Sequence, residues 1–146
     1  FTDAYAKKDF AWMKNIYRKM AKIYFFSAIA LVIMIAVSPF VYHVWVGDKV
    51  SVPFLMTVAV GLYMMIHSWD SLQVNMINGI GTVQLQTYIV ILGSIIHIPL
   101  SLFLGKYIGA LGVVCSMIVV NAIYSTCFTM QIHKILNRSA SGIWLK

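Results

Sequence analysis

Few side chains in this sequence could do chemistry, and one of them stands in an unusual place. Asp70 is the only charged residue between Lys49 and Lys106, and His67 precedes it by three positions. Residues three apart on a helix are neighbours on its surface. A charged Asp at the centre of a membrane-spanning helix costs about 2.5–3.5 kcal/mol on insertion scales, and such residues often mark ion or substrate pathways. We interpret Asp70 and His67 as candidates for a hydrated cavity or gate. The alternative is that both only pack inside a helix bundle.

Further polar residues recur at helical spacing in the stretches on either side. Asn75 shares a face with Thr57, Gly61 and Ser68, and a second group contains His97. A third group is Asn121, Ser125 and Thr129. Polar stripes of this kind either hydrogen-bond one helix to another or line a cavity. Asn75, His97 and Asn121 are therefore further candidates for the cavity, with helix–helix contact as the other interpretation.

Two prolines fall inside apolar stretches. Proline removes one backbone donor and kinks a helix, so Pro39 and Pro99 are candidate hinges. Kinks at proline are also tolerated in spanning helices without a role in movement, and the sequence leaves both interpretations open.

The residue types needed for covalent chemistry are missing. The sequence contains no Glu, no paired carboxylates, no phosphate-binding glycine loop and no metal-ligand spacing. Cys115 and Cys127 fall on one expected helix about 18 Å apart by helical rise, too far apart for a disulfide. We expect no catalytic residue, metal or cofactor, and therefore no enzyme.

The elements that hold these residues are predicted from composition. Hydrophobic residues make up 61% and charged residues 10% of the 146 residues, against about half and a quarter in soluble domains. A small soluble helical bundle with a very apolar core is the other interpretation. A spanning helix needs about 20 apolar residues. We expect an all-α integral membrane fold with a four-helix bundle over 23–133. Its spans are expected at 23–45, 52–76, 83–104 and 111–132.

A separate amphipathic helix is expected over residues 1–22, at the cytoplasmic interface, and a cytoplasmic tail over 134–146. Aromatic and methionine residues such as Met13 and Tyr17 share one face of the helix. A basic face lies roughly opposite, a pattern typical of a helix beside anionic lipid. The candidate lipid contacts on that face are Lys7, Lys14, Arg18 and Lys22. The alternative is an ordinary solvated face. Nucleic acid is not an expected partner, because the charge lies next to the membrane ends.

The basic residues also indicate an orientation. Six Lys and Arg residues precede the first expected span and three follow the fourth, whereas each far-side turn contains one. Cytoplasmic loops carry an excess of Lys and Arg, so we expect both ends of the chain to be cytoplasmic. The expected location is a multi-pass protein of the bacterial inner membrane.

Several segments, taken in order, carry a resemblance. Residues 1–10, FTDAYAKKDF, resemble the cytoplasmic segment that enters the last four helices of polysaccharide (O-antigen type) flippases. These belong to the same superfamily as the multidrug and toxin extruders. Residues 78–81 with 84–86, and then 98–100, are similar to the next connection and helix of that family. Residues 105–113, GKYIGALGV, resemble its last far-side turn. Thr82 departs from the family pattern, which often has a basic residue at that position.

The resemblance implies that this chain is the C-terminal part of a larger two-lobe helical transporter. Such proteins move undecaprenyl-diphosphate-linked oligosaccharide across the membrane by alternating access. The implied partners are this lipid-linked substrate, membrane lipids and the remaining N-terminal helices. A diphosphate calls for cations, but the expected spans contain no Lys or Arg, and the imidazoles of His43, His67 and His97 are weak substitutes. The main anion-binding residues are therefore expected in the N-terminal part.

Two rival functions remain. A cation-coupled multidrug extruder of the same superfamily would share the fold and could use Asp70 as its coupling carboxylate. A non-transporting membrane assembly subunit would need only the polar packing stripes. The sequence does not separate these from the flippase, nor does it indicate the sugar repeat, coupling ion or oligomeric state.

Overall fold

The computed structural model describes residues 1–47 and 52–145, and within these ranges the fold is all helical. The elements are α1 (Thr2–Ala6), α2 (Phe10–Val46), α3 (Phe54–Ile80), α4 (Gln84–Ile108), α5 (Ala110–Leu136) and a 3₁₀-helix, η2 (Gly142–Leu145). The expected turn at Asp48 and Lys49 lies outside the described residues. Each of α2 to α5 has at least 25 residues. At 1.5 Å per residue that length exceeds the hydrocarbon thickness of a bilayer, about 30 Å.

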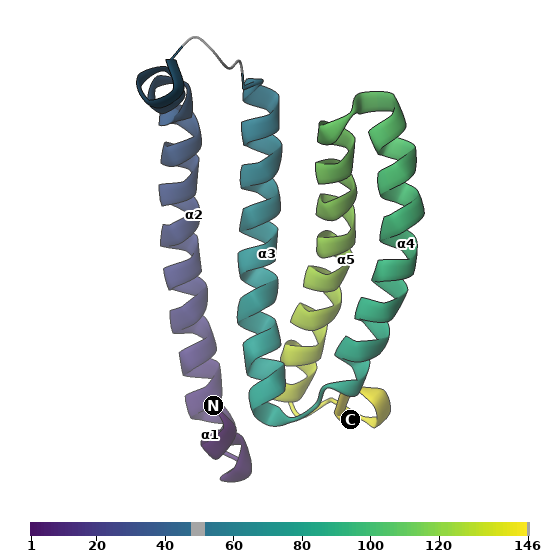
Figure 1. Ribbon diagram of the computed structural model, residues 1–146. Coiled ribbons are helices and arrows are strands. Elements are labelled where there is room, and N and C mark those ends of the chain that lie inside the picture. Colours follow the sequence, from purple (N-terminus) through teal and green to yellow (C-terminus); the bar gives the residue numbers. More distant parts are fainter. Residues whose placement is uncertain (48–51, 146) are drawn as a thin grey trace.

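The long helices stand side by side in one row, and each runs opposite to the one before it in the sequence (Figure 1). Their order across the row is α2, α3, α5, α4, so that α5 lies between α3 and α4 and runs parallel to α3. Both chain ends and the α3–α4 turn lie at the same end of the helix axes, at the bottom of Figure 1. We call this the terminal end. A single row leaves the broad faces of the helices uncovered by other parts of this chain.

Three of these helices, α2, α4 and α5, are long and apolar enough to cross a membrane, with mean hydropathies of 2.3, 2.0 and 1.9 over their most apolar stretches. The chain is therefore a multi-pass membrane protein by length and composition. Polar residues such as His67 and Asp70 lower the hydropathy of α3, although that helix has the length to span. The expected fourth span stays a proposal.

The helix bounds differ from the expected ones at the N-terminus. Instead of one interfacial helix over 1–22 followed by a span, α1 ends at Ala6 and α2 runs unbroken from Phe10 to Val46. The carboxylate of Asp9 accepts a hydrogen bond from the backbone N–H of Trp12 (3.0 Å) and so caps the start of α2. A capped start stabilises the first turn of a helix, and no helix-breaking residue follows until Pro39, inside α2.

The helices continue through both prolines, because Pro39 lies within α2 and Pro99 within α4. The other long helices start within two residues of the expected spans and continue about one turn beyond their expected ends. The prolines therefore sit inside continuous helices, and their role as hinges stays a prediction.

The main hydrophobic core lies at the terminal end. It contains buried residues of α2, α3 and α5, namely Met13, Tyr17, Met76, Ile77, Phe128, Ile132 and Leu136. Met13 and Tyr17 are the residues whose spacing put them on one face of the N-terminal segment, and that face packs against α3 and α5. The core therefore fixes the start of α2 to the ends of the other two helices.

Candidate functional site

The polar side chains of α3 and α5 meet along the line where these two parallel helices touch. Three pairs follow one another in register, each step advancing three residues on α3 and four on α5. The pairs are His67 with Asn121, Asp70 with Ser125, and Gln73 with Thr129. We call these six residues the polar seam. The regular step follows from packing the three-residue ridges of one helix into the four-residue grooves of its neighbour.

Asp70 is the charged member of the polar seam and is only 4% exposed. Neither carboxylate oxygen has a hydrogen-bond partner of good geometry among the described residues. Ser125 is near enough for a loose hydrogen bond that falls short of good geometry, and His67 acts on the carboxylate electrostatically. A buried carboxylate without firm hydrogen bonds is costly, because it has given up its hydration without replacement. Asp70 is thus positioned to hold or exchange a proton or a cation.

The neighbouring pairs of the polar seam are better satisfied. His67 Nδ1 lies 3.3 Å from the side-chain oxygen of Asn121. Gln73, fully buried, donates to the Tyr17 hydroxyl (3.1 Å) and to the Thr129 hydroxyl (3.4 Å). The indole N–H of Trp69 donates to the same Thr129 hydroxyl (2.9 Å). Asp70 therefore stands beside a hydrogen-bonded region but takes no well-formed bond from it.

The structure joins three of the five cavity candidates and separates the other two. Asp70, His67 and Asn121 meet in the polar seam. Asn75 is exposed on another face of α3, and its side-chain amide donates to the Ser71 carbonyl one turn earlier (2.9 Å). His97 lies on α4, on the far side of α5, and is half-buried. Neither residue belongs to the seam.

Sequence reasoning did not select Gln73, a member of the polar seam, or Trp69, whose indole N–H bonds the seam residue Thr129. Gln73 follows Asp70 by three residues, and Asp70 follows His67 by three. This three-residue spacing places Gln73 on the same helix face as Asp70 and His67, and it was the sequence pattern that could have identified Gln73. Tyr17, placed on the aromatic face of the N-terminal segment, could be linked to Gln73 only once α2 was positioned against α3.

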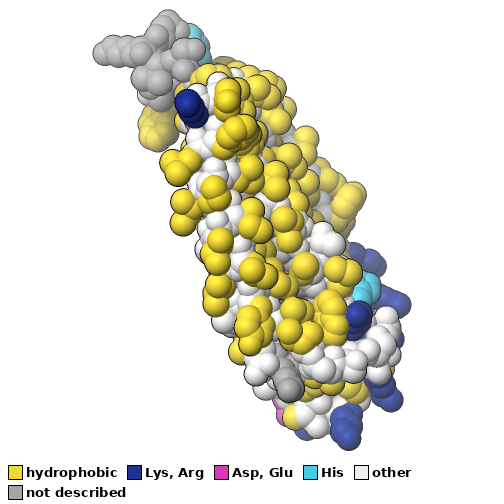
Figure 2. Space-filling view, turned by 90° about the vertical axis from the view of Figure 1, so that its right-hand side faces the viewer, with side chains coloured by type: hydrophobic (Ala, Val, Ile, Leu, Met, Phe, Trp, Pro, Cys, Tyr) yellow, Lys and Arg dark blue, Asp and Glu magenta, His cyan; other side chains and the backbone are white. Residues whose placement is uncertain are grey.

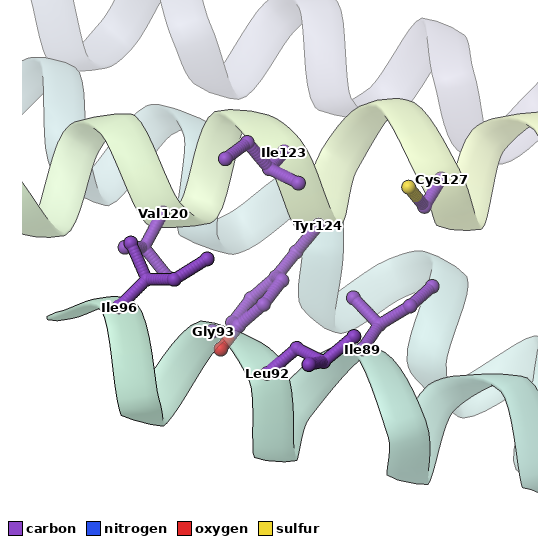
Figure 3. A pocket seen from close by; sticks show the side chains of 8 residues that line it. All are labelled: Ile89, Leu92, Gly93, Ile96, Val120, Ile123, Tyr124 and Cys127. Carbon is purple, nitrogen blue, oxygen red and sulfur yellow. The ribbon is translucent and has the colours of Figure 1, made fainter.

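The contact between α4 and α5 has a different character. The ring of Tyr124 crosses from α5 to Gly93 on α4 (Figure 3). Its hydroxyl donates to the Val90 carbonyl (3.3 Å). A side chain at position 93 would collide with that ring. The cleft beside it, about 250 Å³, is lined almost entirely by apolar side chains such as Ile96 and Val120. This interface can accept hydrocarbon but offers little to a polar substrate.

The candidate lipid contacts lie at the terminal end. Lys7 forms an exposed ion pair with Asp3 (2.9 Å), whereas Arg18 and Lys22 are exposed and Lys14 is half-buried. Both cysteines are free. Among the described residues, no three His, Cys, Asp or Glu side chains gather as metal ligands would.

Comparison with known proteins returned no matching family model, no matching curated protein and no matching solved structure. The function is therefore argued from the chemistry of the polar seam, the arrangement of the helices and the resemblance of the segments described above.

Proposed function

We propose that this chain is the C-terminal part of a transporter that flips undecaprenyl-diphosphate-linked oligosaccharide across the bacterial inner membrane by alternating access. The observation that carries the proposal is Asp70, which is buried between two helices of a membrane protein and has no well-formed hydrogen bond among the described residues. An ionisable residue at such a place is costly and is a functional candidate by default. In the proposal, Asp70 and the polar seam form part of a gate or coupling site.

The arrangement of the helices supports a larger assembly. A single row exposes both of its faces, and the N-terminal helices that this proposal implies would cover one of them. We count α3 as the fourth span, because it lies between α2 and α5 and, at 27 residues, equals α5 in length. The diphosphate of the substrate would be held by cations of the N-terminal part, since the expected spans 23–45, 52–76, 83–104 and 111–132 contain no Lys or Arg.

The orientation proposed is cytoplasmic for the terminal end. Single cysteines at Asn78 and at Lys106, in a protein whose Cys115 and Cys127 are replaced by alanine, test this directly. Both sites are exposed, and they lie at opposite ends of the helix axes, Asn78 at the terminal end and Lys106 at the other. An impermeant thiol reagent added to intact cells should label the cysteine at 106 and spare the one at 78. Labelling at 78 would reverse the orientation, and labelling at both would refute the four-span topology.

The central experiment is complementation of a strain that depends on the full-length protein, with membrane abundance measured in parallel. Asp70→Asn is nearly isosteric and removes only the charge, so abundance should stay normal while surface polysaccharide falls. Ser27→Ala on α2, whose hydroxyl bonds the Tyr24 carbonyl of its own helix, is the control and should leave export unchanged. Full export by Asp70→Asn at normal abundance would exclude Asp70 as a charge-dependent transport residue.

The same strains separate the rival functions. A multidrug extruder would lose drug resistance in Asp70→Asn while polysaccharide stays normal. A non-transporting assembly subunit would lose abundance or assembly in Asp70→Leu, through partners left unpaired, and would tolerate Asp70→Asn.

A further inference from the structure

A basic cleft opens at the terminal end, where the start of α2 meets the end of α5. Its volume is about 300 Å³, and Lys14 and Arg138 line it together with Phe10 and Asn137. The two cations are far apart in the sequence and come together only through the packing of α2 on α5. Figure 2 shows Lys and Arg side chains gathered at this end of the molecule.

No described carboxylate neutralises these two cations. Asp3 pairs with Lys7, Asp9 caps α2 through the Trp12 amide, and Asp70 is buried in the polar seam. Among the described residues, neither the Lys14 ammonium nor the Arg138 guanidinium has an ion-pair partner. The cleft therefore presents positive charge that an anion from outside the chain can neutralise.

The backbone at Arg138 is strained in a way that positions this side chain. Arg138 has φ +57° and occupies the left-handed position of the motif that ends α5. There its N–H bonds the Ile135 carbonyl and the Ser139 N–H bonds the Lys134 carbonyl. Glycine usually occupies this position, because a side chain costs about 1–2 kcal/mol there. Backbone strain of this kind concentrates at functional sites.

The end of α1 repeats the motif with another cation. Lys8 also has φ +57°, its N–H bonds the Tyr5 carbonyl, and the next N–H, of Asp9, bonds the Ala4 carbonyl. Lys8 and Arg138 are the only described residues other than glycine with positive φ. Two helices at one end of the molecule thus keep a basic residue where glycine would relieve strain.

The guanidinium of Arg138 is held in place by an aromatic ring. Its central carbon lies 4.6 Å from the centre of the Phe10 ring, a cation–π distance. Stacking on a ring leaves the N–H edge of a planar guanidinium available, and that edge matches the oxygens of a phosphate. Lys14 supplies a second charge from the facing helix.

We propose that this cleft binds the phosphate of an anionic membrane-lipid headgroup. A lipid is favoured over a soluble phosphate because the cleft lies at the ends of two helices apolar enough to span the bilayer. In addition, Trp12, in the first turn of α2 at the same end of the molecule, is 44% exposed, and tryptophan is enriched at the membrane–water interface. This site goes beyond the proposed function and does not depend on it.

The test is binding of dioleoylphosphatidylglycerol to the protein in neutral detergent, counted by native mass spectrometry against dioleoylphosphatidylcholine. The wild type should bind the anionic lipid preferentially. Arg138→Gly should weaken this binding about tenfold or more, because a charge-assisted hydrogen bond contributes about 1.5–3 kcal/mol. Lys14→Gln should also weaken it. The matched control, Lys19→Gln, removes one exposed charge outside the cleft and should cost about fivefold or less.

Thermal unfolding of Arg138→Gly tests whether its weaker lipid binding comes from misfolding. Arg138→Gly relieves the left-handed backbone, so its midpoint of thermal unfolding should equal or exceed that of the wild type. Equal losses in Arg138→Gly and Lys19→Gln would show diffuse attraction and overturn the site. If inorganic phosphate at the same concentration displaces the lipid, the cleft binds a soluble phosphate and the proposal of a lipid headgroup is overturned. Equal binding of both lipids would overturn recognition of negative charge.

Discussion

In soluble proteins apolar side chains are buried and polar ones are exposed. The polar seam and the C-terminal half of α2 show the reverse, with polar side chains buried and apolar ones exposed. In α2, the most hydropathic of the candidate spans, none of the most apolar stretch is buried, and Phe40 and Trp45 are 69% and 83% exposed. In α3, which is less apolar, Asp70 and Gln73 are almost completely buried. In water the opposite is expected. The comparison shows that the apolar residues of α2 are suited to lipid or to another part of the protein.

The inversion also bears on what holds the helices together. Lipid tails are as apolar as leucine, so burial of apolar surface does not drive helices together inside a bilayer. Close packing and interhelical hydrogen bonds do so instead. The seam between α3 and α5 supplies both, and it adds one carboxylate that is left without a good partner. Structural contact and candidate function therefore share one interface and have to be separated by experiment.

The largest expected contrast is between two phenylalanines. Phe128 on α5 is 1% exposed in the core, whereas Phe40 is 69% exposed on α2. Truncation of a buried Phe to Ala costs about 3–5 kcal/mol in soluble proteins. The lower end is expected here because lipid removes much of the transfer contribution. Phe128→Ala should lower the free energy of unfolding in mixed micelles by about 3 kcal/mol. Phe40→Ala should change it by about 0.5 kcal/mol or less.

Equal costs in the two variants would break the comparison. Such a result would mean that the C-terminal half of α2 packs against protein, within a dimer or against a segment that covers the row. Measurement at several protein concentrations separates these cases, because only a dimer makes the cost depend on concentration.

Much of the fold follows from the sequence for simple physical reasons. Long apolar stretches separated by glycine turns predict long helices, and the structure has them. The stripe of Asn121, Ser125 and Thr129 was visible as a helical period. The order of the helices across the row was not predicted, because α3, α4 and α5 each carry a polar stripe that could face either neighbour. Residues such as Gln73 acquire a role only when that order is known.

The N-terminal segment shows a second limit. A change from basic to apolar composition near Lys22 suggested two helices, but composition does not break a helix. The break in the structure comes earlier, where Lys8 adopts a left-handed backbone and Asp9 caps α2. That geometry depends on local hydrogen bonds, and a basic residue in place of glycine gave no signal for it.

The smallest expected effect is at Trp69, which bonds the polar-seam residue Thr129, and it tests whether helix contact and transport can be separated there. Trp69→Phe removes the 2.9 Å hydrogen bond to Thr129 and keeps an aromatic ring. Interhelical hydrogen bonds in membrane proteins average about 0.6 kcal/mol, so the free energy of unfolding should fall by about that amount. Thr129→Val removes this bond and also the longer bond from Gln73 (3.4 Å), so it should cost somewhat more. The double variant should cost less than the sum, because the Trp69–Thr129 bond is lost in both single variants.

Export measured in the same Trp69 and Thr129 variants shows whether their hydrogen bond is structural or functional. If the Trp69–Thr129 pair only joins α3 to α5, both single variants should lower stability slightly while export, corrected for abundance, stays at the wild-type level. Asp70→Asn, one residue away, should show the reverse: unchanged stability and reduced export. Ser27→Ala on α2, whose hydroxyl bonds only its own helix at the Tyr24 carbonyl, is the control and should change neither. Loss of export in Trp69→Phe at normal abundance would extend the functional site along the seam, because a bond this weak cannot alter transport through stability alone.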